Sequence, residues 1–313
     1  MKIYDNVIVD VSDLYHRSFS IKKKELEGRN LLNETIILTV KQILNLRAKY
    51  LAENGIVWCA FDNPTSKIVN RRLLDPELYK ATRLKESDPF YRGLDYTFVL
   101  LSKYDKGINC IRIKSMEADD LVKPLIETFP ENQKNLLASA DMDWARCMSE
   151  NTHWLSRNGI HTQETFKETY KFTPNENTVT LYKSIQGDNS DNIPAIKGIN
   201  EQTTLNIIEN YFNVYDIFES IKRKDKKSEL LSDYTKKHLI ENKDRLILNH
   251  QLIYFNYVSK QEISSAIIKG QFNETALKIF YEQINFPPSF DKRIKIKKPT
   301  IEDVFSFDDI KRK

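Results

Sequence analysis

Short apolar runs that end in acidic residues constrain the fold of this chain more than any other feature. The runs stand at residues 7–9, 56–61, 109–113 and 135–139, and they lead to Asp10, to Asp62, to an acidic block at 117–120, and to Asp141 with Asp143. Between the first two runs, helical periodicity predicts a helix that Asn33 caps and Gly55 closes. Strands alternating with helices, most of them continuously apolar, predict an α/β fold with a mostly parallel sheet and helices on both faces.

The acids should converge, because the carboxyl ends of parallel strands line one edge of a sheet, where such folds place their sites. The set is Asp10, Asp62, Glu117, Asp119, Asp120, Asp141 and Asp143. At the start of a helix the dipole favours one or two acids. Three carboxylates within four residues repel one another unless a cation lies among them. The alternative, seven solvated loop acids, does not explain why the placement repeats at every strand.

Composition is that of an ordinary soluble protein of one or two domains, since the 313 residues are 40% hydrophobic and 29% charged. The net charge is only +4, so the uneven local charges matter more than the total. Cys59 and Cys110 lie in strand-like runs, which indicates buried thiols in a reducing compartment. We find no signal peptide and no apolar run that could span a bilayer, and we expect a cytoplasmic protein, in the host cytoplasm if it is viral.

An insertion at about residues 64–103 is basic, with eight lysines and arginines against five acids. It also carries aromatic residues: Tyr79, Phe90, Tyr91 and Tyr96. Basic side chains interleaved with aromatic rings suit a nucleic-acid strand, through phosphate pairing and base stacking. A solvated helical excursion with a few core aromatics explains the stretch equally well.

A second informative stretch spans residues 187–199. Asp188 and Asp191 flank a tight turn, Pro194 and Gly198 bound a short loop, and a helix is predicted at 203–211. Two helices around a glycine-containing hairpin aim backbone N–H groups at a phosphate, and Lys197 adds positive charge. An ordinary turn between two helices would leave the paired aspartates without a purpose.

The C-terminal part is less informative. Residues 222–245 are strongly basic, which a solvated helical face explains as well as DNA binding does. Residues 300–310 are acidic and carry apolar side chains, so the tail either docks on the body or forms a short motif for a partner protein.

These motifs, in this order, resemble those of the 5′ nuclease superfamily of flap endonucleases and 5′→3′ exonucleases, from about residue 8 to residue 212. The chain looks closest to the phage replication enzymes of the RNase H type. The matching blocks are Asp10 with Arg17; Asp62 with Tyr79, Lys80 and Arg83; Glu117-Ala118-Asp119-Asp120; residues 139–143; and Gly187-Asp188 with Asp191 and the Gly198 hairpin. Val11 departs from the pattern, since many members have glycine there.

The resemblance implies a PIN-like nuclease domain at residues 1–180 with a helical arch at about 64–103. A helix-hairpin-helix DNA-binding domain would follow at 181–290, and a charged tail at 291–313. The implied function is a structure-specific 5′ nuclease of DNA replication and repair, acting as exonuclease and flap endonuclease and removing RNA primers. Its substrates would be DNA with 5′ flaps, nicks or RNA–DNA primers.

The resemblance also implies roles for single residues. Two Mg²⁺ ions, which Mn²⁺ can replace, would be held by Asp10, Asp62, Glu117 and Asp119 on one side and by Asp120, Asp141, Asp143, Asp188 and Asp191 on the other. The implied catalytic cations are Lys80, Arg83 and Arg17. The implied DNA contacts are Tyr79, stacking on a terminal base, with Arg71, Arg72, Lys197 and Gly198. A potassium ion in the hairpin is a further implied ligand.

Three other classes of function are alternatives to a 5′ nuclease. The main alternative is a non-catalytic DNA-junction-binding protein that retains the fold, although such a protein has no reason to keep the complete acid set. A ribonuclease without the DNA-binding domain would not explain residues 188–199, and a phosphatase would not explain the arch. We expect a monomer without membrane contact, whose tail meets a replication protein such as a single-strand-binding protein or a sliding clamp.

Overall fold

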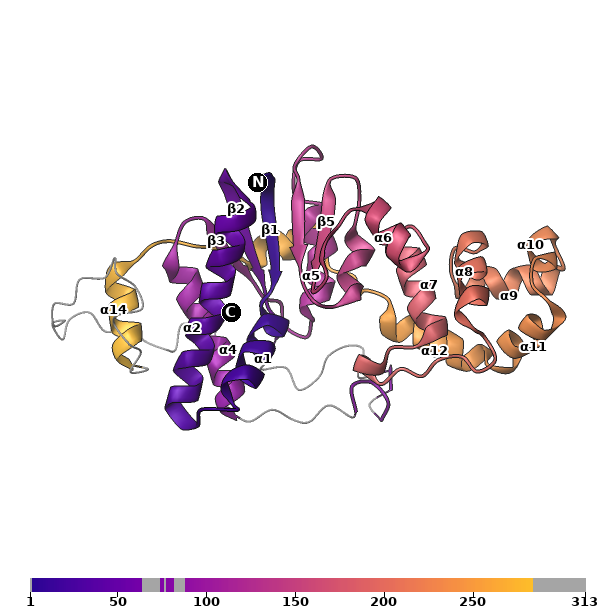
Figure 1. Ribbon diagram of the computed structural model, residues 1–313, viewed down its shortest axis with the longest axis horizontal. Helices are drawn as coiled ribbons and strands as arrows, with labels where there is room; N and C mark the ends of the chain where they lie inside the picture. The colour runs from indigo at the N-terminus through magenta and orange to yellow at the C-terminus, as the bar shows by residue number, and fades with distance from the viewer. Residues whose placement is uncertain (1, 64–73, 76, 82–87, 284–313) are drawn as a thin grey trace. The chain divides into compact units, whose positions relative to one another are not determined.

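The computed structural model describes residues 2–63, 74–75, 77–81 and 88–283. The chain forms two compact units, each built from separate segments of the sequence (Figure 1). Unit 1 comprises residues 1–64, 86–112 and 266–313, and unit 2 comprises residues 65–85 and 113–265. We describe each unit by itself.

Unit 1 contains strands β1 (Tyr4–Asp10), β2 (Leu51–Ala60), β3 (Ile108–Ile111) and β7 (Ile267–Lys269). Strand β2 pairs in parallel with both β1 and β3, whereas β7 runs antiparallel to β3. Val7, Ile8 and Val9 in β1 are all buried, because residues on both faces of this strand are covered. Continuous apolar runs are typical of such strands, and the predicted mostly parallel α/β architecture is confirmed.

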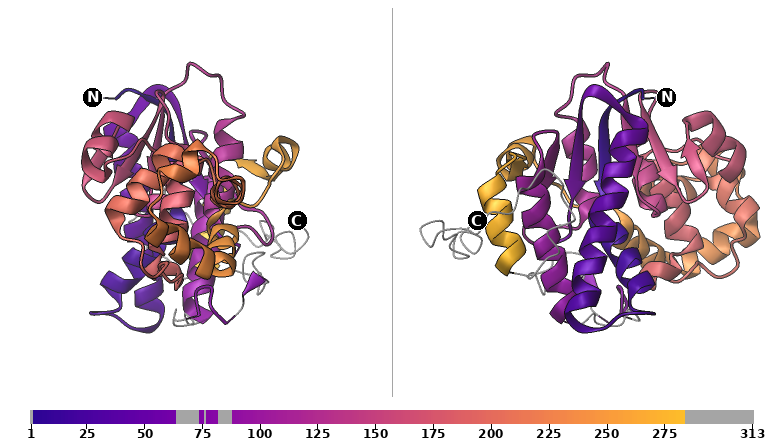
Figure 2. Two further views of the ribbon diagram at one scale, coloured as in Figure 1. Left: turned by 90° about the vertical axis from the view of Figure 1, so that its right-hand side faces the viewer. Right: turned by 60° about the vertical axis from the view of Figure 1, so that its left-hand side comes forward.

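The helices of unit 1 are α1 (Val11–Lys22), α2 (Gly28–Tyr50), α4 (Asp88–Tyr104) and α14 (Glu274–Gln283). Helices α1, α2 and α4 lie side by side, as Figures 1 and 2 show. Phe90, Leu94 and Leu101 recur at helical spacing along α4, and all three are buried. Gly93 lets α1 approach closely, since a Cβ at this position would lie 1.8 Å from the Tyr15 hydroxyl.

Two predictions about the helix between the first two strands, which is α2 in the structure, are wrong. Asn33 does not cap it, because α2 begins at Gly28 and Asn33 is buried inside it. Gly55 does not close it, because α2 ends at Tyr50 and Gly55 lies within β2. The strand passes so close to its neighbour there that a Cβ on Gly55 would lie 2.7 Å from the Asp5 carbonyl oxygen. This glycine therefore marks a close backbone approach and not a helix end.

The predicted insertion at about residues 64–103 is described only in part. Its second half, residues 88–103, lies in α4, a helix of unit 1 in which Phe90 and Phe98 are buried. Phe90 contacts Tyr15 and Phe19 of α1 edge to face, with ring centroids 5.2 Å apart in both pairs. Phe90 therefore belongs to a core and offers no stacking surface to a base, whereas Tyr91 is 38% exposed. Residues 64–73, 76 and 82–87 of the first half lie outside the described residues.

Unit 2 contains strands β4 (Asn135–Ala138), β5 (Thr152–Ser156) and β6 (Gly159–His161). Strand β5 is parallel to β4 and antiparallel to β6. Its first helical elements are α5 (Ala118–Ile126), the 3-10 helix η1 (Met142–Cys147), α6 (Gln163–Tyr170), α7 (Glu176–Gln186) and the 3-10 helix η2 (Asn189–Asp191). These elements carry most of the predicted site.

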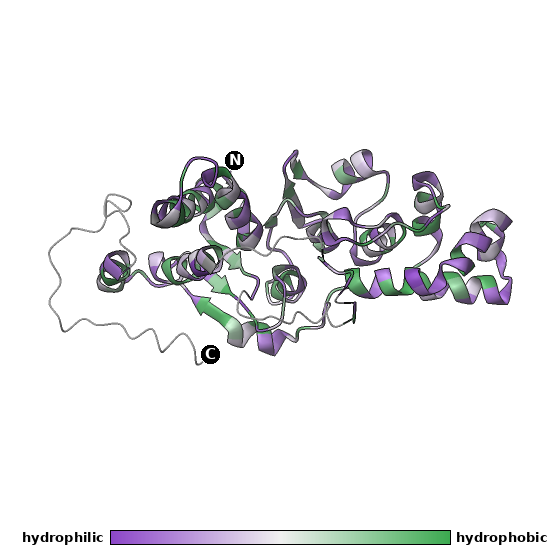
Figure 3. Ribbon diagram, turned by 90° about the horizontal axis from the view of Figure 1, so that it is seen from below, coloured by the Kyte–Doolittle hydropathy of each residue, from purple (hydrophilic) through white to green (hydrophobic). Residues whose placement is uncertain are grey.

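A helical part follows within unit 2. Its helices are α8 (Glu201–Asn210), α9 (Val214–Arg223), α10 (Lys226–Glu229), α11 (Asp233–Glu241), α12 (Lys243–Ile253) and α13 (Lys260–Ala266). The last residue of α13, Ala266, belongs to unit 1. Helix α8 confirms the helix predicted after the hairpin, with Asn200 as its cap. Hydrophobic and hydrophilic residues alternate along the helices in Figure 3, as expected where one face is buried. Among the described residues, no helix combines the length and apolarity that a bilayer crossing requires.

Helix α12 carries a buried histidine that makes folding pH-dependent. The His250 ring lies against Tyr254 and Tyr215, with centroids 5.5 and 5.9 Å away. Burial lowers the pKa of His250 to about 4, from an ordinary value of 6.5. Below pH 6.5 the unfolded chain binds the proton more readily than the folded chain, so stability is lost as the pH falls.

We therefore predict that His250 alone lowers the free energy of unfolding by about 3 kcal/mol between pH 6.5 and pH 4. His250→Gln removes the titrating group and should flatten this part of the pH profile. Urea denaturation of both proteins across this range measures the difference in stability. The carboxylates titrate in both proteins, so their contribution cancels in that difference. Parallel profiles for the two proteins would contradict the prediction.

Candidate metal centre

Two overlapping groups of carboxylates lie in unit 2. Asp119, Asp141 and Asp143 form the first group, and Asp143, Asp188 and Asp191 form the second. Within each group, one carboxylate oxygen of every residue lies within 4.8 Å of the others. Asp143 belongs to both groups, so the acids of three separate sequence motifs meet in one place.

Local helix starts set the directions of these acids. Asp141 caps η1 and accepts the Asp143 N–H at 2.9 Å, while its own N–H donates to the Ser139 hydroxyl at 3.1 Å. Asp119 lies in the first turn of α5 and accepts the indole N–H of the buried Trp144 at 2.9 Å. Because each carboxylate is tied to a neighbouring group, the centre has fixed geometry within the unit.

The second group depends on a hairpin that Gly187 makes possible. Gly187 has φ +77°, and a Cβ there would lie 2.6 Å from the Ile193 carbonyl oxygen. Asp188 and Ile193 exchange two backbone hydrogen bonds of 2.8 Å. Asp188 then caps η2 and accepts the Ser190 N–H at 2.8 Å. A larger residue at position 187 would disturb the turn that presents Asp188.

A buried lysine that the sequence analysis missed links the two groups. The Lys183 ammonium of α7 lies 2.5 Å from carboxylate oxygens of both Asp143 and Asp188, and 3.6 Å from Asp141. Burial tends to lower the pKa of Lys183, but the three carboxylates outweigh burial and raise the pKa above its ordinary value. This ammonium is therefore charged. A lysine within an amphipathic helix looks like a surface residue, and only the pairing in three dimensions reveals it.

The acids themselves respond in opposite directions. Burial raises the pKa of Asp141, which Lys183 opposes only in part, and the neighbouring Asp143 raises it further. Burial also acts to raise the pKa of Asp188, but the charge and hydrogen bond of Lys183, with the Ser190 hydroxyl, lower it below the ordinary value. Asp188 is therefore held ionised, whereas the same environment supports the charge of Asp141 less well.

Lys80 lies on the other side of the centre. Its ammonium is 2.5 Å from Glu117 and 3.8 Å from Asp191. Its backbone N–H donates to the Asp191 carbonyl at 2.8 Å. The predicted cation and two predicted acids are therefore in contact.

Tyr79 is placed differently from the prediction. Its hydroxyl donates to Glu117 at 2.7 Å, and its ring packs with Ile193, Leu252 and Ile253. Because only 1% of Tyr79 is exposed, the ring offers no face to a terminal base in this structure. The segment that carries Lys80 is instead anchored to unit 2 by this tyrosine.

Asp120 belongs to neither of the two groups of carboxylates. One carboxylate oxygen accepts the Asn256 N–H and the other accepts the Asn256 side-chain amide, each at 2.9 Å. The second oxygen also accepts the Glu117 N–H at 3.3 Å. These hydrogen bonds engage both oxygens without using all of their lone pairs, so the predicted role of Asp120 as a metal ligand stays a prediction.

Unit 1 carries the remaining predicted acids. Asp10 ends β1 and caps α1, where it accepts the Asp13 N–H at 2.9 Å. Asp62 follows the neighbouring strand β2, and its N–H donates to the Ser12 hydroxyl at 2.8 Å. Both acids therefore follow the carboxyl ends of adjacent parallel strands. Arg17 forms an ion pair of 2.9 Å with Asp13, one turn earlier in α1.

The predicted DNA contacts are described only in part. Lys197 and Gly198 are exposed in the hairpin. Gly198 has φ +84°, and a Cβ there would lie 2.6 Å from the ring of His238, so glycine is needed at this position too. Arg71, Arg72, Arg83 and the tail at 291–313 lie outside the described residues.

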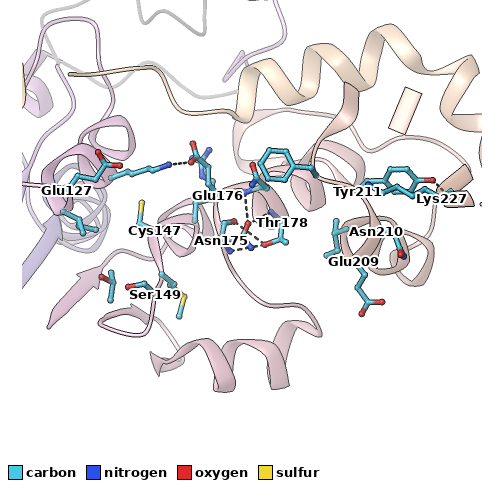
Figure 4. Close-up of a pocket in the computed structure, with 18 residues that line it drawn as sticks. Glu127, Cys147, Ser149, Asn175, Glu176, Thr178, Glu209, Asn210, Tyr211 and Lys227 are labelled. Atoms are coloured by element: carbon cyan, nitrogen blue, oxygen red, sulfur yellow. Dashed lines mark hydrogen bonds and ion pairs between the residues drawn. The ribbon is translucent and has the colours of Figure 1, made fainter. Parts of the chain in front are cut away.

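A separate pocket in unit 2 has a volume of about 680 Å³ and is drawn in Figure 4. None of the predicted site residues lines it. Lys123 and Glu176 form an ion pair across its wall, and Asn175 caps the start of α7 with hydrogen bonds of 2.9 and 3.0 Å. Lys123 and Glu176 are thus paired with each other, and none of the lining residues belongs to either carboxylate group.

The acidic groups fit divalent ions. Mg²⁺ and Mn²⁺ favour carboxylate oxygens, and Mg²⁺ is commonly bound through a few carboxylates while it keeps several waters. Two sets of oxygens that share Asp143 match that chemistry. The donor atoms are oxygens only, which disfavours a zinc site of the structural type.

Comparison with known proteins identifies the family. The family model described as the 5′-3′ exonuclease N-terminal resolvase-like domain matches residues 5–172, and the 5′-3′ exonuclease C-terminal SAM fold matches residues 174–270. The chain belongs to the 5′-3′ exonuclease family. It is accordingly a metal-dependent nuclease, and the resemblance inferred from its motifs is confirmed.

One curated relative and two solved structures match this chain over most of their own length. A 5′-3′ exonuclease of Mycoplasmopsis pulmonis is 24% identical over 276 residues, which cover 87% of this chain and 88% of that protein. The bacteriophage T5 flap endonuclease, in a pseudo-enzyme-product complex with DNA and metal ions, has a TM-score of 0.58 at 22% identity, with 90% of this chain and 97% of that chain covered. The catalytic core of Rad2 with DNA substrate has a TM-score of 0.55 at 15% identity, with 93% and 91% covered.

The contacts of Lys183 generate a prediction for the metal-free protein. Lys183→Met leaves three carboxylates without their shared cation, and in EDTA it should lower the free energy of unfolding by about 3 kcal/mol. Mg²⁺ should restore much of that loss, since a bound cation replaces the missing charge. Urea denaturation with and without Mg²⁺ measures both effects.

Lys237→Met, at a lysine whose side chain is 70% exposed, is the matched control and should change stability little under either condition. If Lys183→Met were equally destabilised with and without Mg²⁺, the lysine would be a packing element and not a counter-charge.

Proposed function

We propose that the chain is a structure-specific 5′ nuclease that hydrolyses DNA phosphodiesters with two Mg²⁺ ions. The observation that carries the proposal is the sharing of Asp143 between two carboxylate groups. In two-metal sites the ions lie about 3.5–4 Å apart, a spacing at which one carboxylate can reach both. Bound ions would supply an activated water and neutralise the charge of the phosphodiester.

The ligands divide according to where the residues lie. Asp119, Asp141, Asp143, Asp188 and Asp191 would hold the ions from unit 2, with Glu117 beside them through its contacts to Lys80 and Tyr79. The predicted ligands Asp10 and Asp62 stand at the ends of β1 and β2 in unit 1, and their role stays a prediction from the sequence. Mn²⁺ should replace Mg²⁺, because both favour oxygen ligands. The proposal gives Asp120 no direct bond to an ion.

The chain's own cations would handle the substrate. Lys80 is proposed to bind the scissile phosphate, where a fixed positive charge stabilises the charge that develops in the transition state. Arg17 and Arg83 are proposed to assist. Lys197 and the backbone at Gly198 would hold the phosphates of the duplex without reading its bases, which makes recognition depend on DNA structure and not on sequence.

The relatives support this assignment of substrate. The T5 flap endonuclease and the Rad2 core are both known in complexes with DNA. We extend the same class of substrate to this chain, as DNA with 5′ flaps or nicks and RNA–DNA primers. Potassium in the hairpin, the monomeric state and a replication protein that meets the tail at 291–313 remain predictions from the sequence.

Digestion of a labelled 5′-flap DNA tests the function. The wild type should release the flap in Mg²⁺ or Mn²⁺ and show no cleavage in EDTA. Asp143→Asn should lower the rate by at least about 100-fold while the protein still binds the flap in Ca²⁺. Products that carry a 5′-phosphate are expected. Tight binding without cleavage at any divalent concentration would instead identify the DNA-junction-binding alternative.

Lys80 provides a second test. Lys80→Ala should slow cleavage by about 100-fold or more, with only a small change in flap affinity, because the proposed contact strengthens in the transition state. Single-turnover rates and Kd values measured in Ca²⁺ separate the two effects. Lys167→Ala, at an exposed lysine of α6, is the control. Equal losses of affinity and rate would make Lys80 a DNA-binding residue only.

A further inference from the structure

Asp120 is distinguished from the other acids of the centre by how completely it is buried. Only 1% of it is exposed, and each of its oxygens accepts at least one hydrogen bond. A buried carboxylate with its lone pairs engaged is a structural anchor, because any movement would leave a charge without partners.

Asn256 holds this carboxylate with two hydrogen bonds. The backbone N–H reaches one oxygen and the side-chain amide reaches the other, both at 2.9 Å. Such a two-point contact fixes the orientation of the carboxylate plane as well as its position. The two residues are 136 positions apart, so the contact ties the C-terminal half of unit 2 to α5.

The anchored residue controls the turn that carries two proposed metal ligands. Asp120 accepts the backbone N–H of Glu117, and Asp119 lies between them. Glu117 receives Lys80 and Tyr79, whereas Asp119 belongs to the first carboxylate group. A shift of Asp120 would therefore redirect both side chains.

Residues 253–256, which we call the strap, also reach the second acidic block. Arg146 donates to the Ile253 carbonyl through one nitrogen and to the Asp143 carbonyl through another, the latter at 3.0 Å. The Arg146 guanidinium lies over the Phe255 ring, 3.5 Å from its centroid. The strap thus contacts Asp120 directly and supports Asp143 through Arg146.

The helix before the strap is bonded to the hairpin. Asn249 of α12 is fully buried, and its amide donates to the carbonyls of Ser184 and Pro194 at 3.0 and 2.8 Å. Helix α12 and the strap therefore connect the hairpin that presents Asp188 with the turns that present Asp119 and Asp143.

We propose that Asn256 is a positioning residue of the nuclease, which sets the metal affinity of the centre by holding Asp120 and, through it, the turn of Glu117 and Asp119. This inference rests on the proposed two-metal function. The strap is the element that keeps the acidic blocks in register, although it contributes no acid of its own.

The test is a reciprocal exchange of the pair. Asn256→Ala removes one of the two contacts, and Asp120→Asn sets amide against amide. Each single change should weaken Mn²⁺ binding by about 10-fold to 100-fold, as loss of partners behind metal ligands does. In the double variant Asp120→Asn with Asn256→Asp, the amide again faces a carboxylate, and part of the affinity should return. Recovery should be incomplete, because the Glu117 N–H also donates to the oxygen that the amide nitrogen replaces.

Calorimetric titration with Mn²⁺ alone gives the affinities, and melting temperatures in EDTA report on folding. Asn158→Ala, at an exposed turn residue, is the control and should bind Mn²⁺ like the wild type. Recovery of Mn²⁺ affinity in the double variant, beyond any recovery of melting temperature, supports the proposal.

Two results would overturn it. Unchanged Mn²⁺ affinity in both single variants would show that the strap does not position the centre. Loss of affinity without recovery in a double variant that melts like the wild type would show that Asp120 itself binds the ion. The proposed function is judged separately, since its failure would appear as a wild type that binds no Mn²⁺ and cleaves no flap.

Discussion

Mutual repulsion among buried carboxylates is the constraint on which the rest of unit 2 depends. Asp141, Asp143 and Asp188 converge on a single ammonium, that of Lys183, and Glu117 and Asp191 lie beside that of Lys80. At these distances and with this degree of burial, removal of either cation would leave charges that few other groups could offset. The two ammonium groups offset only part of the charge of these five carboxylates, so the centre stays negative and suits further cations.

Helix starts place these charges. Asp10, Glu117, Asp141 and Asp188 each cap a helix or a 3-10 helix, and Asp119 and Asp143 stand in first turns. Free backbone N–H groups at helix starts favour negative side chains and restrict their rotamers. The same local rule, applied at successive strand ends, brings oxygen ligands together from distant parts of the sequence.

The alternation of apolar runs with acids was enough to predict the α/β class and the proximity of Asp119, Asp141 and Asp143, because strand direction fixes where chain ends meet. It could not reveal Lys183 or Asn256, because each acts through carboxylates that stand elsewhere in the sequence. Lys183 pairs with Asp188, 5 positions away, and Asn256 binds Asp120, 136 positions away. Tyr79 was misjudged because burial depends on Leu252 and Ile253, which no local pattern connects to it. For Asn33 the local signal itself was misleading. Asparagine is a common helix cap, but here it lies inside α2 and is buried.

The two lysines also bear on how such a centre can be filled and emptied. Many acidic sites are disordered until an ion arrives, because nothing else offsets their charge. Here the ammonium groups of Lys183 and Lys80 lie among the carboxylates of the ion-free fold. Each stands at the end of a long and rotatable side chain. A divalent ion that bound among these carboxylates would therefore meet backbone turns that are already in place, and side chains such as that of Lys183 would be the groups to make room for it.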